Sequence, residues 1–345
     1  MLTIMSMYRS AKTLLTFGLF VFQTTFGQLV VHDFVEVGNP GNLANYNGFG
    51  AVGYAYKIGK FEVTVNQYST YLNAVARSDP YGVYNSMMYS DMNVRGIFRQ
   101  GSNGAYSYSE VSGTGNKPVA YIGWYDAARY CNWLHNGATV GASTETGAYT
   151  LNGATSGSVV SKNSDARFWI PTDDEWYKAA YYSPVKNGVG GYYMYPTQSD
   201  ALPGNLLGSD LNQANIFQNG YAVTGSTTYR TWQNYLTDAG TFSNSASYYG
   251  TFDQAGNIWE WIDVNLSGYS GVRGGSFSSQ GTGSDYDLSS SSPSYSGAGP
   301  ADGNGYFGFR VASVPEPSSL SLLLASGAVL MAGRRRKRKA ISPKG

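Results

Sequence analysis

The sequence has little of the side-chain chemistry on which many enzymes depend. It contains one cysteine, Cys131, and two histidines, His32 and His135. One cysteine excludes an intramolecular disulfide, and two histidines exclude a three-histidine metal site within this chain. Charged residues make up 13% of the chain, about half the usual share. The formal net charge is +1 and much of the basic excess lies at the C-terminus, so no nucleic-acid partner is expected.

Small and aromatic residues are abundant instead. The chain has 44 glycines and 30 tyrosines, together with many serines and asparagines, a composition typical of an exported domain. Hydrophobic residues make up 42% of the chain, which is enough for a packed core and argues against general disorder. Without a disulfide, burial must hold that core, and a structural metal ion is a possible addition.

The N-terminal residues 1–27 have the pattern of a secretory signal peptide. Arg9 and Lys12 provide the positive start, residues 14–22 are apolar, and small residues allow cleavage after Gly27. The alternative is an uncleaved anchor. The apolar stretch is much shorter than the ~20 residues that a membrane-spanning helix needs, which favours the signal peptide.

The C-terminal residues form a second targeting pattern. Pro315, Glu316 and Pro317 precede a short apolar run at 320–333, which ends at a basic cluster at 334–339. Such a cluster stops membrane transfer because the cations stay on the cytoplasmic side. The pattern resembles the PEP-CTERM sorting tail of Gram-negative bacteria that produce exopolysaccharide. The alternative is an ordinary tail anchor.

The sorting-tail resemblance implies a location and a processing partner. An exosortase would cut near the Pro-Glu-Pro motif and release the protein to the cell surface or extracellular matrix, so the membrane anchor would be transient. The chain then divides into a signal peptide at 1–27, a lead-in at 28–50, a globular body at 51–313 and a sorting tail at 314–345.

The body contains few long regular elements. Thr64 and Thr172 are good helix N-caps, and Thr172 has a glutamate three residues later, which is a capping box. Helices are expected from 64 to about 76, from 124 to 135 and from 172, and strands at 54–63, 256–261 and 306–311. The sequence therefore predicts a loop-rich α+β fold.

Six segments of the body, in this order, resemble the formylglycine-generating enzyme, or sulfatase-modifying factor, domain. They are residues 60–68, 117–134, 168–176, 253–261, 272–277 and 308–311. The resemblance implies one domain with a C-type-lectin-like core and little regular secondary structure.

The family's oxidative chemistry requires residues that this chain lacks. Active members bind copper(I) through two cysteines that follow the Arg-Gly-Gly-Ser motif, and soft thiolates select that ion. The matching positions here are Ser279 and Ser284, so no copper and no formylglycine formation are expected. Cys131 lies in an expected helix with apolar neighbours and is interpreted as a core residue.

Two other catalytic possibilities use histidine. A related branch places the same domain beside a three-histidine iron site, which two histidines cannot form. A hydrolase triad built on His135 is not excluded by number, but no nucleophile motif supports it. His135 ends an expected helix, where an imidazole can face the last carbonyl groups.

Calcium is the metal that the resemblance implies. At the first site, Asp253 and Glu260 would supply carboxylate oxygens, and Gly256 and Ile258 would supply main-chain carbonyls. Loop oxygens of this kind suit Ca²⁺. The alternative is that Glu260 lies in solvent on the strand face opposite the flanking tryptophans.

A second calcium site would use Asn215 and the carbonyl of Ile216. Its other ligands would come from around residues 233–236, where the resemblance does not assign them.

Two arginines and a tyrosine-rich stretch have structural interpretations. Arg273 and Arg310 are expected to reach carboxylates in the core. The tyrosines of residues 181–195 are expected to pack and anchor loops, with stacking on sugar rings as the alternative.

The favoured function is a non-catalytic surface module that binds exopolysaccharide or a surface protein. The loop at 276–304, rich in serine, glycine and tyrosine, occupies the place of the missing cysteines, and these residue types are typical of adaptable binding surfaces. One alternative is an enzyme with altered chemistry, which would need a polar cluster near Ser279, Ser284 and Asp285. Another is a structural matrix component.

Overall fold

The computed structural model describes residues 30–266, 269–280, 286–292 and 299–315. The predicted signal peptide and most of the sorting tail, including Glu316 and Pro317, lie outside the described residues, as do Ser284 and Asp285. Within the described ranges, no helix has the length and apolar character needed to cross a bilayer.

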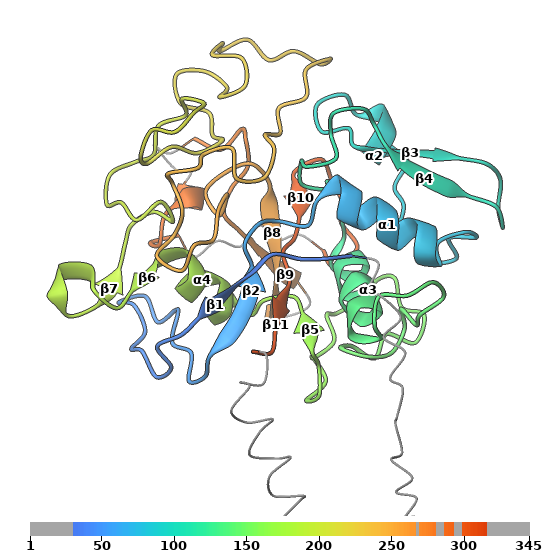
Figure 1. Cartoon of the computed structure of the whole chain (residues 1–345), viewed down its shortest axis with the longest axis horizontal. Coiled ribbons are helices and arrows are strands. Elements are labelled where there is room, and N and C mark those ends of the chain that lie inside the picture. Colours follow the sequence, from blue (N-terminus) through green and yellow to red (C-terminus); the bar gives the residue numbers. More distant parts are fainter. Residues whose placement is uncertain (1–29, 267–268, 281–285, 293–298, 316–345) are drawn as a thin grey trace, which may run out of the picture.

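Short elements joined by long loops make up the body, which confirms the predicted loop-rich α+β fold (Figure 1). The helices are α1 (Val65–Val75), α2 (Met87–Ser90), α3 (Trp124–His135) and α4 (Asp173–Tyr181), with 3₁₀ turns η1 (Lys186–Gly188) and η2 (Tyr286–Leu288). The strands are β1 (Phe34–Val37), β2 (Tyr56–Gly59), β3 (Ile97–Gln100), β4 (Ser107–Glu110), β5 (Phe168–Trp169), β6 (Tyr182–Ser183), β7 (Gly191–Tyr192), β8 (Trp259–Leu266), β9 (Tyr269–Arg273), β10 (Phe307–Gly308) and β11 (Ala312–Ser313).

Two small sheets form the centre of the molecule. The first has the order β1-β2-β11-β5, and its neighbouring strands are antiparallel. The second has the order β10-β8-β9, with β10 parallel to β8. Figure 1 shows α1 and α3 on one side of these sheets and α4 on the other. Because β11 pairs with β2, the end of the body is tied to its beginning.

Local signals place the helices where the sequence predicts them. The side chain of Thr64 accepts a hydrogen bond from the backbone of Gln67, and Thr172 accepts one from Glu175, so α1 and α4 both begin with capping boxes. The predicted helix at 124–135 is α3 (Trp124–His135), so its bounds agree with the prediction. Of the predicted strand at 306–311, only Phe307–Gly308 forms a strand, β10, and β11 follows it at Ala312–Ser313.

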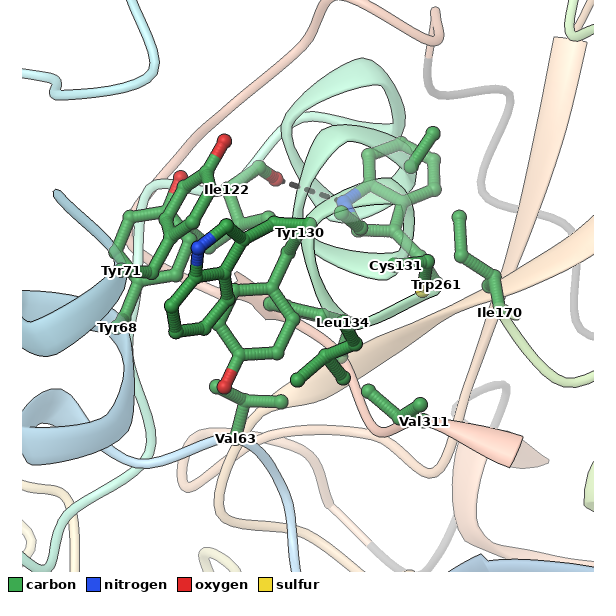
Figure 2. Close-up of a cluster of buried hydrophobic side chains, with 14 of the residues drawn as sticks. Val63, Tyr68, Tyr71, Ile122, Tyr130, Cys131, Leu134, Ile170, Trp261 and Val311 are labelled. Carbon is green, nitrogen blue, oxygen red and sulfur yellow. Dashed lines mark hydrogen bonds between the residues drawn. The ribbon is translucent and has the colours of Figure 1, made fainter. Parts of the chain in front are cut away.

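The main core lies between α1, α3 and the sheets and is rich in tyrosine. The ring centroids of Tyr71 and Tyr130 are 5.2 Å apart in an edge-to-face arrangement. Figure 2 shows these rings in one cluster with Trp261, whose indole nitrogen donates to the carbonyl oxygen of Ile122 at 2.7 Å. Cys131 is fully buried in the same cluster, as predicted.

The two predicted arginine pairs are present. Arg310 donates from Nε and Nη2 to the two carboxylate oxygens of Glu260, each at 2.5 Å, and Arg273 pairs with Asp173. The indole of Trp176 adds a third hydrogen bond to Glu260, at 2.6 Å. Glu260 has no exposed surface, so the alternative that placed it in solvent is wrong: its side chain faces the core rather than water.

Removing one partner of this pair should destabilise the protein strongly. We expect Glu260→Gln to lower the free energy of unfolding by about 3–5 kcal/mol, because the Arg310 charge stays buried without its carboxylate. Urea unfolding followed by circular dichroism measures the change. The matched control is Glu36→Gln on the exposed part of β1, expected within about 0.5 kcal/mol of the unmodified protein. Equal effects of the two changes would contradict the structural role given to the pair.

Candidate functional site

Hydrogen bonds hold the loop around Ser279 in one conformation. The Ser279 hydroxyl accepts a hydrogen bond from the backbone of Ser276 at 3.0 Å and donates to Asp287 Oδ2 at 3.3 Å. Its carbonyl oxygen accepts from the backbone of Phe217 at 3.1 Å, and only 6% of the residue is exposed. The hydroxyl is therefore used to hold the loop in place.

A pocket of about 240 Å³ opens beside this loop and is here called the aromatic pocket. Its wall combines four aromatic rings with three polar side chains. The lining residues are Asp91, Asn93, Val94, Tyr121, Tyr229, Phe277, Asn304, Gly305 and Tyr306.

A row of stacked rings forms one side of the aromatic pocket. Tyr229 stacks on Tyr235 with centroids 5.3 Å apart, Tyr235 on Phe277 at 5.4 Å, and Phe277 on Tyr306 at 5.4 Å. The inner two rings are buried, whereas Tyr229 is 45% and Tyr306 37% exposed. The row therefore joins the core to rings that a ligand can reach.

Hydrogen bonds fix the polar side of the pocket. Tyr229 donates to Asn93 Oδ1 at 2.7 Å, and the amide nitrogen of Asn93 donates to the carbonyl oxygens of Arg230 and Gln233 at 2.8 Å. The loop that carries Tyr229 is thereby attached to the segment after α2. The same loop presents Trp232, which is 67% exposed.

Tyr121 stands in an unusual conformation at the rim. Its φ angle of 62° lies in the left-handed region, which is uncommon for a bulky residue and is often found at functional positions. The segment before β10 supports this conformation, because the Tyr121 N–H donates to the Asn304 carbonyl oxygen at 3.0 Å. The Tyr121 hydroxyl donates to Asp91 Oδ2 at 2.6 Å.

A second pocket, of about 190 Å³, is also lined by Tyr121 and includes Pro300, Ala301 and Gly303, which directly precede Asn304 of the aromatic pocket. Asp126, in the first turn of α3, lines it and accepts a hydrogen bond from the Gly123 N–H at 2.9 Å. Burial raises the pKa of Asp126 to about 7, although this hydrogen bond and Arg129 oppose the shift. Tyr121 therefore separates two neighbouring pockets and lines both of them.

The first predicted calcium site does not have the expected free oxygens. Both oxygens of Glu260 accept hydrogen bonds from Arg310. Asp253 accepts the N–H of Gly240 at 2.7 Å, and burial raises its pKa to about 6. Gly256 and Ile258 are buried beside them. In this arrangement Glu260 does not fit as a ligand, because a cation there would have to displace the arginine.

The oxygens of the second predicted site also have protein partners. The carbonyl of Asn215 accepts from the N–H of Asn257 at 2.8 Å, and that of Ile216 accepts from Asn205 Nδ2 at 3.2 Å. The side chain of Asn215 donates to the Tyr235 carbonyl at 2.9 Å. Across the ranges that the structure describes, no three His, Cys, Asp or Glu side chains converge as metal ligands. Calcium stays a prediction at both sites.

Two residues of the aromatic pocket, Phe277 and Asn304, lie in the 276–304 loop that the sequence predicted as a binding surface. The other lining residues were not singled out for binding, and the sequence pointed instead to the tyrosines of 181–195. Tyr181 is buried, and its ring packs on Tyr177 with centroids 4.8 Å apart, so packing is the main role of that stretch. His135 lies at the end of α3 and accepts from the Arg167 N–H at 3.2 Å. His32 contacts the hydroxyl of Tyr130 at 2.8 Å.

Comparison with known proteins identifies the domain. Residues 51–314 match the family model described as Sulfatase-modifying factor enzyme 1-like domain, FGE-sulfatase. No curated protein sequence matches the chain.

Several solved structures are similar at low identity. The crystal structure of CarF is 17% identical, with a TM-score of 0.46 over 83% of this chain and 99% of CarF. Treponema denticola variable protein 1 is 17% identical, with a TM-score of 0.45 over 82% of this chain and 95% of that one. PvdO from Pseudomonas aeruginosa is 14% identical, with a TM-score of 0.41 over 82% and 92% of the two chains. Likeness at this level says nothing about activity.

The buried carboxyls make stability depend on pH. The pKa values of Asp126 and Asp263 are raised to about 7 and that of Asp253 to about 6, chiefly by burial. The folded state therefore binds more protons than the unfolded chain between about pH 4 and 7, and stability falls as pH rises through that window. Burial lowers the pKa of His32 to about 4 and also lowers that of His135, and these two groups oppose the trend.

We expect the melting temperature to fall between pH 5 and pH 7.5, and to fall less in Asp126→Asn, which keeps an oxygen for the Gly123 N–H. Differential scanning calorimetry at both pH values measures this. A melting temperature that rises with pH, or an unchanged slope in the variant, would contradict the assignment.

Proposed function

The chain belongs to the sulfatase-modifying factor enzyme 1-like family, FGE-sulfatase, and on that premise we propose that it is a non-catalytic binding module that holds polysaccharide at the aromatic pocket. One observation carries the proposal. A row of stacked rings leads from the buried Phe277 to the exposed Tyr306, beside fixed carboxylate and amide groups.

The chemistry of the pocket suits a sugar. A pyranose ring has an apolar C–H face and a rim of hydroxyls, so it needs a flat aromatic surface with hydrogen-bonding groups at the edge. Tyr306 and Tyr229 offer the surface, and Asp91 and Asn304 offer the edge. The rings are held by their neighbours before any ligand arrives, which reduces the entropy lost on binding.

The family's oxidative activity has no support in the thiol chemistry of the chain. Ser279 is a hydroxyl in a braced loop, and hydroxyls do not replace thiolates for copper(I). Cys131 has no exposed surface, and burial raises its pKa well above the usual value. A thiol of this kind is a poor ligand and a poor nucleophile.

The targeting signals suggest where such binding would be useful. A signal peptide at 1–27 and a sorting tail at 314–345, processed by an exosortase, would place the body at the surface of a Gram-negative cell or in its matrix, with only a transient membrane anchor. Exopolysaccharide is abundant there. A surface protein is the other ligand that the export route allows. A nucleic-acid partner is not proposed.

The exposed rings provide a direct test. We expect Tyr306→Ala to weaken binding of the producer's own extracted exopolysaccharide about tenfold, since a stacking aromatic contributes about 1.4 kcal/mol. Tyr229→Ala should act similarly. Quantitative pull-down with purified protein measures the affinity, with and without Ca²⁺, because calcium is still a predicted structural ion.

The matched control is Tyr46→Ala, since Tyr46 is 78% exposed but lies outside the pocket lining. Wild-type affinity is expected for it. Equal affinities of all three variants, or no saturable binding by the unmodified protein, would reject the aromatic pocket and favour a protein ligand or a structural matrix role.

A further inference from the structure

A third cavity, larger than the two described above, shares no lining residue with the aromatic pocket. Its volume is about 600 Å³, within the usual range for small-molecule sites. The wall comes from the segment before β1, the start of α1 and the loop after Leu236. The lining residues are Val31, His32, Asp33, Phe61, Glu62, Thr64, Gln67, Asn116, Asp238, Ala239, Gly240 and Thr241.

Glu62 is an unsatisfied carboxylate in the wall of this cavity. The residue is 2% exposed, and its Oε1 accepts a hydrogen bond from Asn257 Nδ2 at 3.1 Å. Its Oε2 is buried and has no hydrogen-bond partner. A buried carboxylate oxygen without a partner is costly, so its presence beside a cavity points to a ligand that supplies the missing donor.

The nearby cations are already engaged. The guanidinium of Arg310 binds Glu260 and the carbonyls of Gly59 and Phe252. Lys117 contacts Asp238 Oδ1 at 3.4 Å and donates to the Leu236 carbonyl at 2.6 Å.

The cavity itself is therefore acidic. Asp33, Glu62 and Asp238 line it, and no lysine or arginine is among its lining residues. Two cations stand next to lining residues: Lys117, which pairs with Asp238, and Lys60, whose Nζ lies 5.3 Å from the ring centroid of Phe61. Walls of one charge sign concentrate the field and attract a counter-ion.

The size and spacing of the groups favour an organic cation over a bare metal ion. A divalent metal needs several oxygens within about 2.6 Å of one point, whereas no such convergence of acidic side chains exists among the described residues. A protonated amine needs only one or two carboxylates, and its carbon skeleton can fill the remaining volume.

We propose that this cavity is a binding site for a small organic ligand that carries a protonated primary amine, with the ammonium group bound by Glu62. The amine donates to Oε2, the rim carboxylates of Asp33 and Asp238 attract it, and Thr64 and Gln67 offer hydrogen bonds to the rest of the ligand. The site is separate from the proposed polysaccharide function and does not depend on it.

The protonation of Glu62 is linked to this binding. Burial, followed by Asp253 and Glu260, raises the pKa of Glu62 well above its usual value, while Arg310 opposes the shift. A bound ammonium stabilises the carboxylate form and so displaces a proton. Proton release on binding is a readout that an uncharged or merely filling ligand would not give.

The experiment is isothermal titration calorimetry with four probes. Glucosamine and putrescine carry amines, while glucose and 1,4-butanediol are their uncharged counterparts, so the two pairs separate sugar-borne from alkyl amines. We expect saturable binding of at least one amine and none of its counterpart. Titration in buffers of different ionisation enthalpy should reveal the released proton.

Glu62→Gln is the decisive variant, because its amide oxygen still accepts the Asn257 hydrogen bond while the charge is lost. Affinity for the amine should fall at least about tenfold. Asp238→Asn changes an exposed rim residue and should weaken binding several-fold without affecting the fold. The proposal is overturned if neither amine binds, if the uncharged probes bind equally well, or if both variants keep wild-type affinity.

Discussion

The ion pair between Glu260 and Arg310 is the interaction on which the rest of the structure depends. It is completely buried, and Arg310 also binds carbonyl oxygens at the end of β2 and in the loop before β8. Trp176 brings α4 to the same carboxylate. A buried charge is tolerated only with its partner, so one arrangement of these segments is strongly preferred. The fixed arrangement of these segments holds the long loops in place although the domain has little regular secondary structure.

This arrangement explains why family membership does not decide the chemistry. The buried pairs of Glu260 with Arg310 and Asp173 with Arg273 form the base, whereas the loop that holds Ser279 rests on it. Ser279 and Ser284, which the resemblance predicts at the positions of the family's cysteines, belong to that loop and not to the base. The ring of Phe277, directly after the Arg-Gly-Gly-Ser motif, is part of the stacked row of the aromatic pocket.

Much of the base could be predicted from the sequence, and little of the candidate site. The helices that begin after Thr64 and Thr172 carry their signals within a few residues, and Arg273 and Arg310 stand among apolar residues that imply buried partners. The aromatic pocket, by contrast, combines the segment after α2 with Tyr121, Tyr229 and Tyr306, and no local pattern links residues so far apart.

Glu260 is a case in which the alternation of polar and apolar residues along a strand does not predict solvent exposure. The alternation of Trp259, Glu260 and Trp261 suggested a solvated glutamate, but Glu260 and Trp261, which point to opposite faces of β8, are both buried, so polarity does not mark exposure there. No sequence pattern predicted the unpaired oxygen of Glu62, because the residue stands between Phe61 and Val63 like any polar residue of an alternating strand.

The most direct measurement of the central claim is a crystal structure of the protein with an oligosaccharide prepared from the producer's exopolysaccharide. The account predicts a sugar ring against Tyr306 or Tyr229, with hydroxyls bonded to Asp91 or Asn304. Sugar density at another surface, or an aromatic pocket that is filled by a neighbouring loop of the protein, would contradict it.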